Sequence, residues 1–384
     1  MLRLAYLLAV SLALTACAPS VAPPPAASQL SELPVAAHQA VTEVDYRFQT
    51  RDGQTLVAKL TLPAEARTPV PVVIFIGGSG TWDSDYAQRV DAKTLNVLLP
   101  VADWATRSAQ AGIAFVRYQK RGVVDPGAAL VESWRTATLF NLLDDLRALL
   151  AKVKADPRLD GSRIALLGHS EGTMLATWVG ANDPSVKAYV FLGFVRRNLK
   201  EVYRFQLVNR NGNRLFAFAD TQPQDDLLEA SEIAAATRKG LNFGNWRRFD
   251  RDRDGRLSKE EYLTLLDRSY EDWVRMIVSS TSERLVPGNG SPAGWFQQHF
   301  RHEPVGETWR RLWAPVLVIQ GKSDTNTPFD TEVAPFAAML AAKGHPDHRV
   351  VGLEGLDHWY KDSSGVSQAN RTFDLFLPWL KHRL

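Results

Sequence analysis

The chain has 384 residues, of which 45% are hydrophobic and 23% charged, and its formal net charge is +3. This apolar content is ordinary for a globular protein and can form a sizeable core, which excludes a largely disordered chain. The charges are spread along the sequence rather than gathered in one basic segment, so nothing indicates a nucleic-acid partner.

The first residues have the pattern of a bacterial lipoprotein leader. Arg3 precedes an apolar run over residues 4–16, which has the length of a signal-peptide core and is too short to cross a bilayer as a helix. The run ends at Leu14-Thr15-Ala16-Cys17, which resembles a lipobox, and Cys17 is the only cysteine of the sequence. We predict a signal peptide over 1–16 and lipidation of Cys17, with an ordinary secretory signal and an incidental cysteine as the alternative.

The segment that follows, residues 17–42, is rich in alanine, proline and serine and is predicted to be a flexible tether. By resemblance to lipoproteins, Ala18 after the cysteine indicates release to the outer membrane. We therefore expect a protein of the cell envelope, held at the membrane only by its N-terminal lipid.

Short apolar runs alternate with helical patterns beyond the tether. Two alternating segments, 44–49 and 55–62, flank Arg51-Asp52-Gly53, a turn signal that predicts an antiparallel pair. Leucines at helical spacing predict a helix over 138–154. Continuous apolar runs, typical of strands covered on both faces, occur at 70–76, 113–118, 164–167, 188–194, 315–320 and 349–353. This order predicts an α/β fold whose central sheet is mostly parallel, with helices on both faces.

The strand pattern is interrupted between residues 196 and 312, which are polar, rich in tryptophan and helical in character. We predict a helical cap over 196–312, inserted between a first core part at 43–195 and a second at 313–384. Because ligands bind at the carboxyl ends of the strands in open α/β sheets, we expect the cap to lie over that edge.

The pentapeptide Gly168-His169-Ser170-Glu171-Gly172 is the most informative motif. It follows the apolar run 163–167 and precedes a helix-forming stretch that begins at Thr173. A strand, Gly-x-Ser-x-Gly and a helix form a nucleophile elbow, in which a sharp turn presents the serine hydroxyl above the sheet edge. A plain strand-to-helix turn is the alternative.

A reactive serine needs a base, and the base needs an orienting group. His358 follows the last predicted strand, and Asp324 follows the strand at 315–320. Ser170, Asp324 and His358 thus each stand just past the end of a strand, and we predict that they form a triad. Asp357 is a rival acid, but the side chains of adjacent residues on an extended loop point apart, so that of Asp357 should point away from His358. His169 is a rival base, but its side chain should point away from the reacting face of Ser170. A turn-capping role is the alternative for Asp324.

The reaction also places negative charge on the substrate carbonyl oxygen, which requires fixed donors. One donor is the N–H of Glu171, directly after the nucleophile. We assign the other to the Ser79 N–H, in the glycine-rich segment Ile76-Gly77-Gly78-Ser79-Gly80 after the strand at 70–76. A glycine-rich turn that only reverses the chain is the alternative.

Together these motifs resemble the α/β-hydrolase superfamily, in particular bacterial secreted hydrolases related to the dienelactone-hydrolase and prolyl-oligopeptidase groups. The elbow, the glycine-rich segment, Tyr118-Gln119-Lys120-Arg121-Gly122, the segment 315–328 and the His358 loop match in order, over about 45–195 and 313–384. The resemblance implies hydrolysis of an ester, thioester or peptide through an acyl-enzyme on Ser170, after which His358 activates water. Members often have His-Gly-Ser-Gly in the oxyanion segment, whereas Gly77 stands in place of that histidine here.

A second motif lies in the predicted cap, where residues 250–261 match an EF-hand calcium loop. A hard cation prefers a shell of oxygen ligands, and this spacing supplies one. The predicted ligands are carboxylates at loop positions one, three, five and twelve, a backbone carbonyl at seven and a hydroxyl at nine: Asp250, Asp252, Asp254, Glu261, Arg256 and Ser258. We find no second such loop, so we expect a lone, structural site that fixes the cap helices and shapes the acyl pocket. A decayed loop, with Ser258 and Glu261 serving only as a capping box, is the alternative.

The sequence therefore predicts a lipid-anchored serine hydrolase that cleaves carboxylic esters of a small-molecule substrate, without a cofactor in the chemical step and with a calcium-stabilised cap. A serine peptidase of the prolyl-oligopeptidase type is one alternative. The other is a non-catalytic calcium-binding lipoprotein on a hydrolase scaffold, which the complete triad disfavours.

Overall fold

The computed structural model describes residues 40–89, 95–125, 128–129, 131–221, 224–241 and 243–384. The described chain divides into two units. The core unit comprises residues 40–202, 280–285 and 291–384, and the helical unit comprises 203–279 and 286–290. The predicted signal peptide at 1–16 and Cys17 lie outside the described residues.

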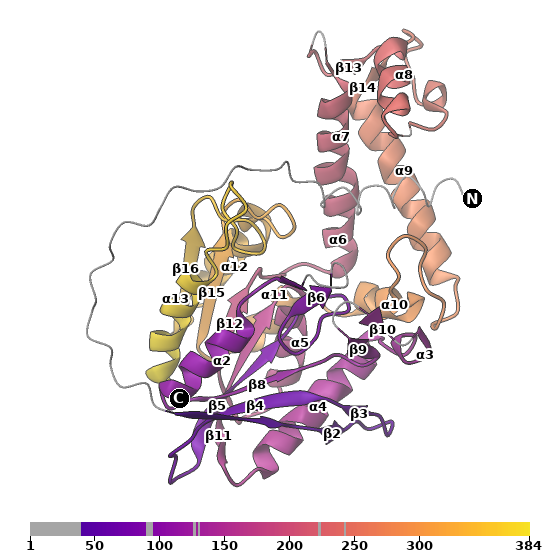
Figure 1. The fold of residues 1–384 in the computed structure, drawn as a ribbon. Helices are drawn as coiled ribbons and strands as arrows, with labels where there is room; N and C mark the ends of the chain where they lie inside the picture. The colour runs from indigo at the N-terminus through magenta and orange to yellow at the C-terminus, as the bar shows by residue number, and fades with distance from the viewer. Residues whose placement is uncertain (1–39, 90–94, 126–127, 130, 222–223, 242) are drawn as a thin grey trace, which may run out of the picture. The chain divides into compact units, whose positions relative to one another are not determined.

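An eight-stranded sheet forms the centre of the core unit (Figure 1). Its strands, in spatial order, are β1 (Val41–Asp45), β4 (Ala58–Pro63), β8 (Ala114–Tyr118), β5 (Val70–Ile76), β11 (Leu159–His169), β12 (Val186–Leu192), β15 (Val316–Gly321) and β16 (His348–Leu353). β4 is antiparallel to both of its neighbours, and the strands from β8 to β16 are parallel. The predicted α/β architecture is confirmed, including an antiparallel pair at the sheet edge.

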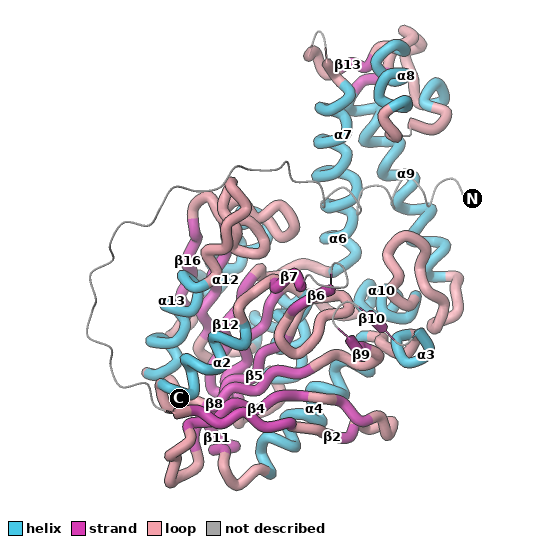
Figure 2. The backbone as a smooth tube through the Cα atoms, in the orientation of Figure 1, coloured by secondary structure: helices cyan, strands magenta, loops and turns pink. Residues whose placement is uncertain are grey.

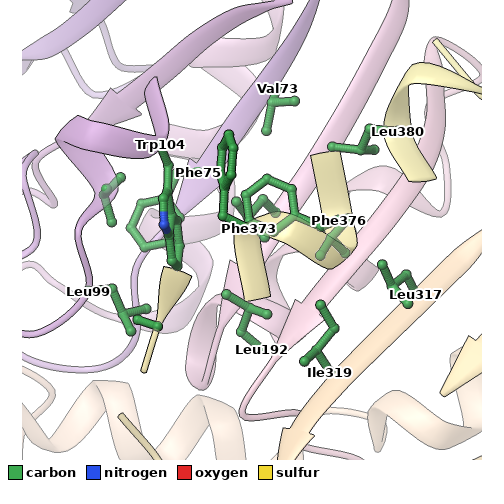
Figure 3. Packing of buried hydrophobic residues seen from close by; sticks show 14 of the residues in the cluster. Val73, Phe75, Leu99, Trp104, Leu192, Leu317, Ile319, Phe373, Phe376 and Leu380 are labelled. Carbon is green, nitrogen blue, oxygen red and sulfur yellow. The ribbon is translucent and has the colours of Figure 1, made fainter. Parts of the chain in front are cut away.

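One face of the sheet packs on α2 (Val101–Gln110) and α13 (Asn370–Lys381). Figure 3 shows Trp104 of α2 beside Phe373 and Phe376 of α13, over side chains from the strands. Trp104 is fully buried and its ring is 5.4 Å from that of Phe376. Alternate side chains of continuous apolar strands point to opposite faces, so such strands need a second layer of helices as well.

The opposite face carries α4 (Leu139–Ala155), α5 (Glu171–Gly180), α11 (Val305–Arg311) and α12 (Ala334–Ala342). Trp309 of α11 packs edge-on against Tyr189 of β12 and against Phe336 of α12. The remaining elements of the core unit are β2 (Phe48–Gln49), β3 (Thr55–Leu56), β6 (Ala87–Arg89), β7 (Leu95–Val97), β9 (Val123–Asp125), β10 (Ala128–Ala129), α3 (Val131–Trp134), α10 (Ala293–Arg301) and a π-helix at Phe329–Val333.

The helical unit is built around three helices that pack on one another, α7 (Asn211–Ala219), α8 (Ala230–Arg238) and α9 (Lys259–Val278) (Figure 2). Its core contains Phe216, Ile233 and Tyr262, one from each helix. α6 (Leu199–Arg204) leads into the unit, which also contains a π-helix at Phe205–Arg210, a 3-10 helix at Trp246–Arg248 and the short strands β13 (Leu227–Leu228) and β14 (Leu257–Ser258).

The helical unit is narrower than the predicted cap at 196–312, because α10 and α11 pack within the core unit. Gln298 of α10 accepts the backbone N–H of Phe140 at 2.8 Å, and the indole of Trp309 in α11 donates to Thr177 at 3.1 Å. At the other end, β1 begins at Val41, inside the predicted tether. Among the described helices, none combines the length and the apolar character needed to cross a bilayer.

Candidate active site

Ser170 occupies a sharp turn between β11 and α5. Its φ of +53° is unusual for a residue with a side chain, and its N–H donates to the Leu192 carbonyl at 2.9 Å. The flanking glycines are required by close packing: a Cβ at Gly172 would lie 1.9 Å from the carbonyl oxygen of Ile76, and one at Gly168 would lie 2.5 Å from that of Gly172. The turn therefore has the geometry that the pentapeptide predicts for a nucleophile elbow.

His358 and Asp324 form a buried pair beyond the ends of β16 and β15. Nδ1 of His358 lies 2.7 Å from Oδ2 of Asp324. Burial by itself raises the pKa of Asp324, but the charge of His358 and the hydrogen bonds from His358 and Thr327 outweigh it, so the pKa lies below its ordinary value. Because the ionised carboxylate only accepts, Nδ1 of His358 carries the hydrogen and Nε2 is left to accept a proton.

The rival acid, Asp357, has a local role. Its Oδ1 accepts the backbone N–H groups of Trp359 and Lys361, each at 2.8 Å, and thereby shapes the loop that carries His358. The structure thus pairs Asp324 rather than Asp357 with the histidine, as the sequence analysis expects.

The end of β12 lies against both the serine turn and the His358 ring. A Cβ at Gly193 would lie 2.9 Å from Cε1 of His358, and the residue before it, Leu192, accepts the N–H of Ser170. Both candidate residues therefore adjoin the same strand end, where ligands bind in open α/β sheets.

His169, which the sequence analysis left without a role, joins two parts of the site. Its Nε2 lies 3.1 Å from the backbone oxygen of His358, and its Nδ1 lies 2.9 Å from the hydroxyl of Tyr86. A carbonyl oxygen only accepts, so Nε2 carries the hydrogen and Nδ1 accepts from Tyr86. Burial, followed by the charge of His358, lowers the pKa of His169 to about 3. The imidazole is thus neutral and its hydrogen bonds have a fixed direction.

The glycine-rich segment after β5 lies directly against the elbow. A Cβ at Gly78 would be 3.0 Å from that of Ser170, and the Gly78 N–H donates to the Tyr86 hydroxyl at 2.8 Å. A Cβ at Gly77 would be 2.8 Å from the Tyr86 ring, so Tyr86 fills the space that a larger residue would need. Neither the Ser79 N–H nor the Glu171 N–H donates to another described residue.

The side chain of Glu171 is the centre of a buried polar cluster. Its Oε2 accepts from Lys120 at 2.6 Å, and its Oε1 accepts from the indole of Trp295 at 2.6 Å and lies 3.3 Å from Nε2 of His299. Burial favours the neutral acid, but the charge of Lys120 and the hydrogen bonds outweigh it and lower the pKa of Glu171 to about 2. The sequence does not indicate this cluster, because Trp295 falls within the predicted cap at 196–312 and Lys120 belongs to the motif at 118–122, far from Glu171 along the chain.

The predicted calcium loop lies in the helical unit. One carboxylate oxygen each from Asp250, Asp252 and Asp254 lies within 4.8 Å of the others, and Oδ1 of Asp250 is buried without a hydrogen-bond partner among the described residues. Glu261 is not in this group, since its Oε2 accepts the N–H and the hydroxyl of Ser258 in a capping box. The side chain of Arg256 pairs with Asp254 at 2.9 Å. Three of the predicted ligands, the aspartates, therefore lie close together, whereas Ser258 and Glu261 are hydrogen-bonded to each other.

An earlier segment, described at residues 220–221 and 224–232, repeats hydrogen bonds of this loop. Asp250 accepts the N–H of Gly255 at 3.1 Å, and Asp220 accepts the N–H of Asp226 at 3.1 Å. The φ angles of Gly255 and Asp226 are +82° and +61°. Each segment ends in a glutamate whose carboxylate accepts two backbone N–H groups. Glu261 accepts those of Arg251 at 2.6 Å and Ser258 at 3.0 Å. Glu232 accepts those of Thr221 at 2.8 Å and Glu229 at 3.0 Å.

The two segments also pair through a short antiparallel ribbon. In β13 and β14, Leu228 stands opposite Leu257, and both side chains are fully buried. The segment at 250–261 is thus paired with a second segment, although the sequence analysis identifies no second calcium loop. The partner lacks the regular aspartate spacing and is one residue longer, which is why the motif search did not identify it.

Replacing His169 by glutamine should reduce the amount by which the free energy of unfolding decreases in mild acid. The folded-state pKa of about 3 is far below the usual 6.5, so the unfolded chain binds a proton that the folded protein excludes. The stability is complete above pH 6.5 and falls as the pH decreases from there toward 3. Between pH 6 and pH 5, the slope of the unfolding free energy against pH should be smaller in His169→Gln than in the unmodified protein, by up to about 1.4 kcal/mol per pH unit.

Urea denaturation across this pH range measures the slope. His382→Gln, which changes an exposed histidine, serves as the control and should retain the slope of the unmodified protein. The same slope in His169→Gln would show that the buried imidazole is not held neutral.

No protein-family model and no curated protein matches this chain. Solved structures do match, among them acylaminoacyl peptidase of Pyrococcus horikoshii, with a TM-score of 0.52 and 13% identity over 90% of this chain and 42% of that one. A puromycin-hydrolyzing peptidase of Mycobacterium tuberculosis matches with a TM-score of 0.50 and 16% identity, over 92% and 42% of the two chains. An alpha/beta hydrolase of Penicillium sp. sh18 has a TM-score of 0.49 and 17% identity, over 89% and 99%.

This chain spans less than half the length of both peptidases, and identities at this level establish the fold alone. The sheet order, the serine turn after β11 and the positions of Asp324 and His358 after β15 and β16 agree with that fold. The chain therefore has the α/β-hydrolase fold.

Proposed function

We propose that the protein is a serine hydrolase that cleaves carboxylic esters through an acyl-enzyme on Ser170. The observation that carries this proposal is the buried Asp324–His358 pair, which adjoins the same sheet edge as Ser170, a residue with a positive φ just before α5. This arrangement supplies a nucleophile, a base and an orienting carboxylate from three separate segments.

In the first half of the proposed reaction, the Ser170 hydroxyl attacks the ester carbonyl carbon while its proton passes to Nε2 of His358. Asp324 stabilises the imidazolium through the 2.7 Å contact at Nδ1. The N–H groups of Ser79 and Glu171 would hold the negative carbonyl oxygen. The C–O bond to the alcohol then breaks, and His358 gives its proton to the departing oxygen.

In the second half, His358 removes a proton from water, whose oxygen attacks the acyl carbon. The bond to Ser170 breaks, the serine recovers its proton from His358, and the carboxylic acid leaves. The site needs no other group for these steps, since each proton is taken up and returned by His358.

A serine peptidase is the second candidate, because both structures described above with TM-scores of 0.50 or more are peptidases and the same triad could cleave amides. A non-catalytic calcium-binding lipoprotein is the third. For either enzyme we propose attachment to the cell envelope through lipidated Cys17, with a small-molecule substrate.

Hydrolysis of aryl esters of increasing acyl length, measured beside aryl amides, tests the proposed activity. We expect turnover of esters of short to medium acids and none in Ser170→Ala, because no other residue provides the activated hydroxyl. Ser364→Ala, a change of an exposed serine, should keep full activity. Preferential amide cleavage would favour the peptidase, and no labelling of the unmodified protein by a fluorophosphonate would leave only the binding protein.

Substitution of Asp324 and of Asp357 tests which of the two carboxylates orients His358. Asp324→Asn removes the charge that stabilises the imidazolium, so kcat should fall by about 10³- to 10⁴-fold. Asp357→Asn keeps an acceptor for the two loop N–H groups and should cost less than about tenfold. Steady-state kinetics on one ester suffices, and equal losses in the two variants would contradict the assignment.

We also propose that the helical unit binds one structural calcium ion in loop 250–261. The three gathered carboxylates and the unpartnered Oδ1 of Asp250 support this, since calcium takes oxygen ligands. The ligands would be Asp250, Asp252, Asp254, Ser258, Glu261 and the Arg256 carbonyl. The paired segment 220–232 supports the loop through the ribbon between β13 and β14, so an ion would stabilise both segments.

Titration calorimetry should detect one calcium ion per chain, and calcium at 100 times its Kd should stabilise the folded protein by about 2.7 kcal/mol. Asp252→Asn removes one predicted ligand charge and should weaken binding at least about tenfold. Asp272→Asn, an exposed change on α9 outside the loop, is the matched control and should bind normally. Absence of calcium uptake by the unmodified protein would remove this proposal and leave the esterase proposal standing.

A further inference from the structure

Lys120 touches both segments that carry the proposed oxyanion donors. It lies just after β8, and its Nζ donates to the Gly78 carbonyl at 2.5 Å and to the Glu171 carboxylate at 2.6 Å. Gly78 precedes Ser79, the first proposed donor, and Glu171 is itself the second. One ammonium group thus joins two parts of the site that are far apart in the sequence.

The contact with Gly78 controls the direction of the Ser79 N–H. The carbonyl of Gly78 and the N–H of Ser79 belong to one planar, trans peptide unit, so they point in opposite directions. Because the Gly78 carbonyl oxygen points toward Lys120, the Ser79 N–H points away from Lys120. A charged donor on the carbonyl also polarises the peptide and strengthens the N–H as a donor.

The Tyr86 hydroxyl holds the other side of the same residue. It accepts the Gly78 N–H at 2.8 Å, so Gly78 is bound through both of its backbone polar groups. A Cβ at this position would meet the Tyr86 hydroxyl oxygen at 2.7 Å as well as Ser170, which limits the position to glycine. Little freedom is left for rotation of the peptide between residues 78 and 79.

The contact with Glu171 fixes the second donor. Glu171 is the first residue of α5, where a backbone N–H has no partner within the helix. Its carboxylate is held by Lys120 and Trp295, and its side chain is only 2% exposed. Restricting the side chain restricts the backbone that carries the N–H.

Stability alone does not account for this ion pair. A buried pair rarely adds net stability over an apolar pair of similar volume, because both charges lose their hydration. The neighbouring Arg121 pairs with Asp145, in which both side chains are 1% exposed, and its guanidinium also binds Asp52, which is 43% exposed. Neither Arg121 nor Asp145 touches Gly78 or Glu171. This second pair separates the effect of a buried ion pair from the effect of contact with the donors.

We propose that Lys120 is a positioning residue that aligns both oxyanion donors, through the Gly78 carbonyl on one side and the Glu171 carboxylate on the other. The inference rests on the proposed serine hydrolase function. Lys120 contacts neither the serine nor the histidine and acts through the two peptide groups.

The test compares Lys120→Met with the charge-balanced double variant Lys120→Met/Glu171→Gln, since the single change leaves a buried carboxylate unpaired and can prevent folding. Arg121→Met/Asp145→Asn is the matched control, which removes the adjacent buried pair. For each folded variant, kcat and KM are measured on an aryl ester, together with the affinity for an aryl boronic acid. In the boronate adduct the Ser170 oxygen bonds to boron, its proton passes to His358, and one boron-bound oxygen takes the place of the oxyanion.

We expect kcat in the Lys120 variants to fall about tenfold or more with KM within about threefold, since the donors act on the transition state. Boronate affinity should fall by a similar factor. The control should change kcat and boronate affinity by less than about threefold, even where it lowers the melting temperature.

Unchanged kcat and boronate affinity in the charge-balanced double variant would overturn the inference, as would equal losses in the control. These results leave the proposed function intact, because they compare variants of an active enzyme. Absence of both turnover and fluorophosphonate labelling in the unmodified protein would instead remove the proposed function and this inference with it.

Discussion

The close approach of the start of α5 to the end of β5 determines the geometry of the candidate active site. Gly172 and the Ile76 carbonyl are so near that no side chain fits between them. This contact places the serine turn beside the glycine-rich segment, where Gly78 lies against Ser170. The left-handed conformation of Ser170 is the local cost of this packing, and the hydrogen bond from its N–H to Leu192 offsets part of that cost.

Around this contact, the polar groups at the sheet edge are buried and joined to one another. Tyr86 and His169 link the glycine-rich segment to the loop of His358, and Lys120 links it to α5. Each link has a fixed direction, because carbonyl and carboxylate oxygens only accept while the ammonium group only donates. A network of this kind fixes the backbone groups that it contacts, so that the proposed reaction would need little reorganisation when charge develops.

Much of the core could be predicted from the sequence, because its signals are local. Continuous apolar runs mark the strands, and the glycine spacing around Ser170 marks the turn. The pairing of Asp324 with His358 could be anticipated from their places after predicted strands. The Lys120–Glu171 contact joins residues 51 positions apart, and no local pattern reports it. Tyr86 lies in an irregular segment, and its position opposite Gly77 depends on tertiary packing.

In the helical unit, sequence-based prediction is incomplete for a different reason. The loop at 250–261 has a regular spacing of carboxylates that a sequence pattern can detect, whereas its partner at 220–232 repeats the backbone hydrogen bonds without that spacing. Backbone geometry can be supplied by several residue types, as Asp226 shows by adopting the conformation of Gly255. The predicted cap at 196–312 includes α10 and α11, because both are helical like the inserted unit, although they pack on the core.

The salt bridge behind the serine turn has an evolutionary consequence. Loss of either partner alone would strand a charge inside the protein, so Lys120 and Glu171 are expected to be exchanged together during divergence. The residue after the serine in Gly-x-Ser-x-Gly would then carry information about a distant position. A glutamate there would mark, among related genomes, the lineages that have kept a basic side chain two residues before Gly122.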